Sequence, residues 1–149
     1  MSYQEKSTIV NIISTLLVSA FFWVYILQRY QAENPELMAI FKFWGTAFVT
    51  LIVLSIVANI IITIIFTIIN TIVTKEEEDP LFVDERDKLV ELKGTRNACY
   101  LFSGGVVFAM VTLTLDIHPS MMFIILILSG MAGDIFGNMT RLYFYRRGV

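Results

Sequence analysis

Four long apolar runs divide the chain into two pairs, and a charged segment separates the pairs. The runs cover residues 8–28, 43–73, 98–115 and 119–138, and only the last contains a charged residue. A helix needs about 20 mostly apolar residues to cross a hydrocarbon core of about 30 Å. Because lipid offers no water to unpaired backbone groups, each run is expected to be a helix. We therefore predict an all-α, polytopic membrane protein whose residues 1–149 form a single transmembrane domain, a four-transmembrane-helix bundle.

The second and third runs differ in length from an upright span. As a helix, the run 43–73 would be about 45 Å long at about 1.5 Å per residue, so we expect it to tilt or to continue past the membrane surface. The run 98–115 is barely long enough to span, and we expect it to continue a helix that begins in the charged segment before it. A hydrophobic fraction of 56% exceeds what a soluble core of this size needs, which agrees with exposure to lipid.

The basic residues lie unevenly on the two sides of the predicted spans. Nine of them fall before the first span, in the loop 74–97 or after the fourth span, whereas only Arg29 and Lys42 fall on the other side. The positive-inside rule then places both termini and the loop 74–97 in the cytoplasm. Aromatic residues within 21–30 and 41–44 are interpreted as a belt at the outer membrane interface.

The loop 74–97 holds most of the charge, because 13 of the 24 acidic and basic residues lie within residues 75–96. After an acidic tether, Asp79-Pro80 breaks the chain, and Asp84 stands where a helix N-cap is expected. An amphipathic cytoplasmic helix is therefore predicted to lead into the third span, with Gly94 as a candidate bend. This helix is either a solvated collar that orients the bundle or a docking surface for a cytoplasmic protein partner. The candidate docking residues are Asp84, Glu85, Arg86, Asp87, Lys88, Glu91, Lys93 and Arg96.

Polar residues also follow one face of the second run. They recur at intervals of three or four residues, so they form a single stripe along a helix. The stripe comprises Asn59, Thr63, Thr67, Asn70 and Thr74. We expect such a stripe to face neighbouring helices, where each polar contact contributes about 0.6–2 kcal/mol, rather than a pore.

The fourth run contains the one acidic residue within any predicted span, Asp134. A carboxylate at membrane depth costs about 2.5–3.5 kcal/mol on insertion scales unless it finds a partner or water. Asn138 and Arg141 follow four and seven residues later on the same helical face, so Arg141 is a candidate electrostatic partner. Two interpretations remain open: a structural pair with Arg141, or a role of Asp134 in handling protons or cations.

Small residues surround Asp134 in the same run. These residues are Ser129, Gly130, Gly133 and Gly137. Gly133 and Gly137 have the spacing of a small-xxx-small contact face. Such spacing predicts close helix packing, either inside the bundle or in a homodimer.

Two segments resemble a known group of proteins. The sequence DERDKLVELKGTRN at 84–97 precedes a span, and YRRG at 145–148 ends the fourth helical segment. Together they resemble small prokaryotic four-helix integral membrane proteins of unknown function. Proteins of this kind are often encoded beside small helix-turn-helix regulators, which implies a membrane sensor or regulatory subunit in a prokaryotic cytoplasmic membrane. The group supplies no catalytic residues to carry over.

An enzyme is not expected, because the chain lacks a phosphate-binding glycine loop and a metalloprotease motif and has one histidine and one cysteine. We also expect no cofactor, no metal site and, at a net charge of −2, no direct nucleic-acid binding. The first hypothesis is a non-enzymatic sensory, regulatory or scaffolding subunit, homo-oligomeric in the bilayer, that engages a partner through the central helix. The alternative is a small transporter or channel for an ion or small solute that uses Asp134 and the polar stripe.

Overall fold

The computed structural model describes residues 3–30, 36–74 and 85–147, and the described residues form four helices. The helices are α1 (Tyr3–Arg29), α2 (Leu37–Thr74), α3 (Glu85–Thr114) and α4 (Pro119–Arg147). All four are long and apolar enough to cross a membrane, and the described residues contain no strand. The prediction of an all-α protein with four candidate spans is confirmed at this level.

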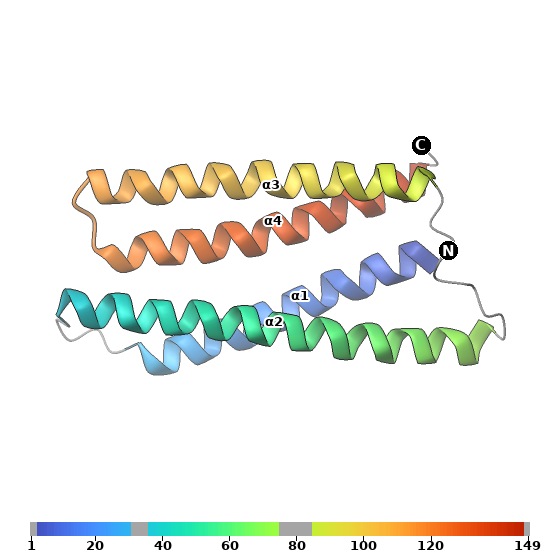
Figure 1. The fold of residues 1–149 in the computed structure, drawn as a ribbon, viewed down its shortest axis with the longest axis horizontal. Coiled ribbons are helices and arrows are strands. Elements are labelled where there is room, and N and C mark those ends of the chain that lie inside the picture. Colours follow the sequence, from blue (N-terminus) through green and yellow to red (C-terminus); the bar gives the residue numbers. More distant parts are fainter. Residues whose placement is uncertain (1–2, 31–35, 75–84, 148–149) are drawn as a thin grey trace.

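α4 lies at the centre of the bundle. It packs along α3 and also contacts α1 and α2, whereas α3 contacts no other helix in the described part of the chain. α2 packs mainly on α1, which crosses behind it, and both termini lie at the same end of the molecule (Figure 1). Every described contact between the first pair of helices and the second pair is therefore made by α4.

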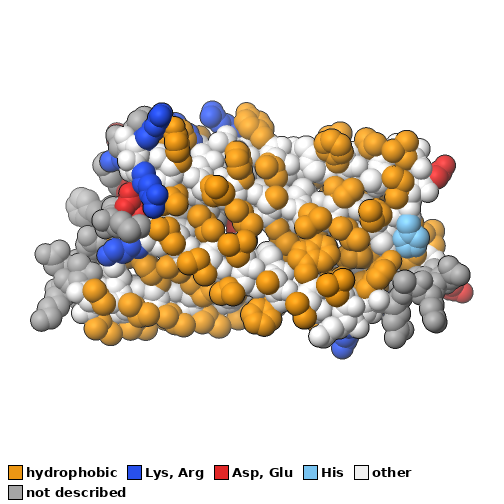
Figure 2. Space-filling model, turned by 180° about the vertical axis from the view of Figure 1, so that it is seen from behind, with side chains coloured by type: hydrophobic (Ala, Val, Ile, Leu, Met, Phe, Trp, Pro, Cys, Tyr) orange, Lys and Arg blue, Asp and Glu red, His pale blue; other side chains and the backbone are white. Residues whose placement is uncertain are grey.

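The surface of the bundle has the composition expected for lipid contact. Hydrophobic side chains cover the middle of the face seen in Figure 2, while the lysine and arginine side chains gather toward the ends. The isoleucines of α2 are typical, since Ile60, Ile64 and Ile68 are each more than half exposed. Exposure of this kind would be unfavourable in water but matches a hydrocarbon environment.

The helices continue well beyond the apolar runs. α2 begins at Leu37, six residues before the predicted span, and α3 is one continuous helix from Glu85. The expected helix before the third span is therefore present and merges with it, while Asp84 and the acidic tether 75–79 lie outside the described residues. Charged and polar residues extend a helix into water at little cost, so apolar runs mark only the part of each helix that needs lipid.

Glycine and alanine residues bring α3 and α4 into close contact. A Cβ atom added to Gly133 would lie 3.1 Å from the carbonyl oxygen of Ala98, and one added to Gly137 would lie 3.0 Å from the Ala98 Cβ. On α3, the space beside Gly105 is filled by the side chain of Ser129. The small residues of α4 thus pack against α3 inside the bundle, as small-xxx-small faces do in membranes.

Gly94 takes part in this packing and does not bend the helix. A Cβ atom there would lie 2.9 Å from the Arg141 Nε and 2.9 Å from the Gly137 carbonyl oxygen, and α3 continues through the position as regular α-helix. The glycine is needed for the close approach of α4.

Aromatic residues form the core at the end opposite the termini. Trp44 is 1% exposed and stacks on Phe123, with ring centroids 6.0 Å apart and an interplanar angle of 1°. Phe22, Ile26 and Ile127 are buried in the same cluster. The aromatic residues within 21–30 and 41–44 were expected to form an interfacial belt. This interpretation is wrong for Phe22 and Trp44, because these rings fill the space between helices.

Candidate functional site: a polar cavity at Asp134

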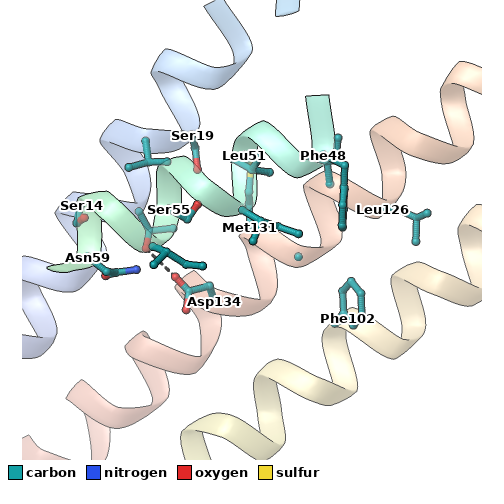
Figure 3. Close-up of a pocket in the computed structure, with 16 residues that line it drawn as sticks. Ser14, Ser19, Phe48, Leu51, Ser55, Asn59, Phe102, Leu126, Met131 and Asp134 are labelled. Carbon is teal, nitrogen blue, oxygen red and sulfur yellow. Dashed lines mark hydrogen bonds between the residues drawn. The ribbon is translucent and has the colours of Figure 1, made fainter. Parts of the chain in front are cut away.

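A cavity of about 370 Å³ lies between α1, α2 and α4, with one side chain of α3 at its edge. Figure 3 shows Asp134, Asn59 and Ser14 toward one end of the group of lining side chains and Phe48, Leu126 and Phe102 toward the other. The cavity is thus polar at one end and apolar at the other. The lining residues are Ser14, Thr15, Val18, Ser19, Phe48, Leu51, Ile52, Ser55, Ile56, Asn59, Phe102, Leu126, Ile127, Gly130, Met131 and Asp134.

Asp134 receives hydrogen bonds from two helices. The Thr15 hydroxyl of α1 donates to its Oδ2 at 2.6 Å, the contact drawn as a dashed line in Figure 3. The Asn138 Nδ2 donates to its Oδ1 at 3.5 Å and to its main-chain oxygen at 3.1 Å. Donors aimed at a carboxylate stabilise its negative charge, which lowers the cost of holding it at membrane depth.

Arg141 is connected to Asp134 through Asn138. Its Nη1 donates to the Asn138 Oδ1 at 3.3 Å, and its Nη2 donates to the Thr95 hydroxyl of α3 at 3.1 Å. Among the described residues, the guanidinium and the Asp134 carboxylate make no direct ion pair, and the buried Arg141 Nε has no hydrogen-bond partner. The two side chains are thus linked only through the amide of Asn138, and the Asp134 carboxylate lines the cavity.

The polar residues of α1 and α2 complete the polar part of the cavity. Thr15 and Ser19 on α1 and Ser55 and Asn59 on α2 are each four residues apart, so each pair lies on one helical face. None of Ser14, Thr15, Ser19 and Ser55 was selected as a site residue from the sequence. The signal that would have found them is this shared spacing of small polar residues in two spans.

The polar stripe of α2 does not face the bundle as a unit. Asn59 lines the cavity, and Asn70 is half-buried, whereas Thr63 and Thr67 are exposed on the outer surface. The helix turns a different set of residues inward, which comprises Leu51, Ser55, Ala58, Ile62, Phe66 and Asn70.

Threonine can face lipid because it satisfies its own hydroxyl. The Thr67 hydroxyl donates to the Thr63 carbonyl oxygen at 2.9 Å, and the Thr71 hydroxyl donates to the Thr67 carbonyl oxygen at 2.9 Å. These bonds within the helix remove the need for a neighbouring helix, which is the physical reason for the difference from the expected inward stripe.

The candidate docking residues other than Asp84, which lies outside the described residues, lie along the first part of α3. Two of them, Asp87 and Lys93, are half-buried. The exposed ones are Glu85, Arg86, Lys88, Glu91 and Arg96. The Lys93 ammonium lies 4.3 Å from the centroid of the Phe144 ring, a cation–π contact that ties α3 to the end of α4. No residue of this set lines the cavity, so the two groups of predicted residues are treated as separate sites.

The chemistry available in the cavity is electrostatic recognition. The lining contains one carboxylate, several hydroxyls and an amide, and the described residues contain no group of three histidine, cysteine or acidic side chains that could hold a metal ion. A single carboxylate without a direct cationic partner attracts a single positive charge. Comparison with protein-family models found no match to the chain, and searches of curated proteins and of solved structures found none either.

Proposed function

We propose that this chain is a small, non-enzymatic membrane transporter that binds a cationic solute at Asp134. The observation that supports it best is the position of the Asp134 carboxylate, which faces a cavity within the bundle and has hydrogen-bond donors but no direct cationic partner among the described residues. A carboxylate held for structure alone would be expected to pair directly with Arg141. An unpaired carboxylate at membrane depth is characteristic of ion and proton pathways.

The proposed setting is a prokaryotic cytoplasmic membrane, with both termini and the charged start of α3 in the cytoplasm. The excess of nine basic residues on this side over two on the other supports that orientation. Both termini also lie at one end of the bundle, as an even number of spans requires (Figure 1).

The test is cation flux into proteoliposomes, measured for protons, potassium and alkylammonium ions. Replacing Asp134 with asparagine keeps the shape of the side chain and removes its charge, and we expect the flux of the transported cation to fall at least about tenfold, the effect of losing one charged interaction. The matched control is Asp116→Asn, which removes the same charge from the exposed α3–α4 turn and is expected to leave flux unchanged. Equal flux through the wild type and Asp134→Asn for every cation would contradict the proposal.

A second function, engagement of a cytoplasmic protein partner, is supported by the exposed charges of α3. Among the described helices, this end of α3 contacts only α4, and several of its acidic and basic side chains are exposed to another surface. Charge reversal at Arg86, Lys88 and Glu91 is expected to remove specific partners in proximity labelling. An unchanged set of labelled proteins would argue for a solvated collar instead.

A further inference from the structure

We infer that the cavity takes an amphiphilic organic monocation, such as a long-chain alkylammonium, that enters sideways from the bilayer between α2 and α3. This inference rests on the proposed role of Asp134 as a cation site and adds the class of solute and its route. It draws on the shape of the cavity, the chemistry of its walls and the exposure of its rim.

The cavity is closed on one side and open on another. Its inner wall includes Ser14 and Ile127, which are 3% and 2% exposed. Its rim includes Ile56 of α2 and Phe102 of α3, which are 54% and 42% exposed. α2 and α3 make no contact with each other in the described part of the chain, so nothing described there closes the rim between them. At this depth the medium outside that rim is hydrocarbon.

The size and walls of the cavity fit an organic ligand better than an inorganic ion. A volume of about 370 Å³ is within the range of small-molecule sites, which begins near 300 Å³. A bare metal ion or a proton needs no such space, and a hard cation prefers about six oxygen ligands in a compact shell. Here the single carboxylate is accompanied mostly by apolar side chains, of which Phe48, Leu51 and Met131 are examples.

The polar and apolar ends of the cavity set the orientation of the ligand. Along α2, the lining extends from Phe48 to Asn59, a distance of about 16 Å at about 1.5 Å per residue. A cationic head group at the Asp134 end would leave an alkyl chain lying toward Phe48, Leu126 and Phe102 (Figure 3). The exposed lining residues are mostly apolar, and Asn59 and Asp134 are exposed beside them, which suits an amphiphilic ligand that already lies in the membrane.

The binding test uses decyltrimethylammonium and the uncharged 1-decanol with the full-length protein in nanodiscs, measured by isothermal titration calorimetry. Binding of decyltrimethylammonium to the wild type is expected to be at least about tenfold tighter than to Asp134→Asn. The same variant should bind 1-decanol as the wild type does, since only the charge differs. Partitioning into lipid is equal in the two samples and therefore cancels.

The route is tested by narrowing the rim. Ile56→Trp adds bulk at the opening and is expected to slow the association of decyltrimethylammonium severalfold, while Ile61→Trp, on the same helix and 50% exposed but outside the lining, should not. Both positions are exposed, so neither change disturbs the packing of the helices. Equal association rates in these two variants would overturn entry between α2 and α3.

The remaining outcomes separate this inference from the proposed function. Suppose that Asp134→Asn abolishes potassium or proton flux but binds decyltrimethylammonium as tightly as the wild type. The inference of an organic cation is then wrong, and the proposed cation site at Asp134 is retained. If the variant matches the wild type for every cation in both flux and binding, the cation site itself is wrong.

Discussion

Replacing Gly105 with leucine is expected to force α3 and α4 apart and to destabilise the folded bundle by about 3 kcal/mol, the upper part of the range for overpacking. Any side chain at this position would occupy the space that the Ser129 side chain already fills. The residue it meets is anchored on the central helix, so the clash cannot be relieved by moving the end of a flexible side chain. The midpoint of unfolding in a sodium dodecyl sulfate titration, followed by circular dichroism, measures the effect.

The neighbouring glycine supplies a matched control for this change. A Cβ atom added to Gly104 has nothing within 4 Å, and the residue is exposed. Leucine there extends into lipid and improves helix propensity, so Gly104→Leu is expected to be neutral or stabilising by about 1 kcal/mol. If both variants shifted the midpoint equally, close packing of α3 on α4 would not be the cause.

Replacing Trp44 with alanine is expected to be the second large loss, about 3–5 kcal/mol, because truncating a buried aromatic ring leaves a cavity. The ring is 1% exposed, stacks on Phe123 and lies within 6.0 Å of the Tyr30 and Phe43 rings by centroid distance. It therefore joins the ends of α1, α2 and α4. The same detergent titration measures the change.

Trp44→Phe separates the loss of packing from the loss of the indole nitrogen. The Trp44 Nε1 is buried and has no hydrogen-bond partner among the described residues, so removing it sacrifices no bond. Phenylalanine retains most of the stacked ring, and its cost is expected to be below about 1.5 kcal/mol, as for other conservative hydrophobic replacements. A cost for phenylalanine equal to that for alanine would show that the ring contact contributes little.

The sequence predicted the number and kind of helices and a helix that leads into the third span from about Asp84, but not the start of α2 or which helices pack together. Hydrocarbon thickness sets a minimum apolar length, which is why four runs were sufficient to predict four spans. The same criterion cannot detect the first turns of α3, because charged residues such as Glu85 are stable in a helix in water. The side of the membrane that carries the termini stays a prediction from the distribution of basic residues.

The site was predictable only in part, for a similar reason. Asp134 was selected because a carboxylate within an apolar run is costly wherever it lies. Its donor Thr15 is 119 residues away in the chain, and nothing local to either residue indicates that α1 packs beside this turn of α4. The spacing of Asn138 placed it on the same helical face as Asp134. Its position between the two charged groups, however, depends on the hydrogen bond from Arg141 to Thr95 on α3, which no local pattern indicates.

The central position of α4 has a consequence for how the chain assembles during insertion. α3 and α4 form a helical hairpin that can pack as soon as both are in the bilayer, since α3 requires no other helix. The first hairpin, α1 and α2, must wait for α4 before it contacts anything in the second half. The cavity therefore cannot form before α4 reaches α1 and α2, and until that contact is made Asp134 lacks the hydroxyl of Thr15 that helps to hold its charge.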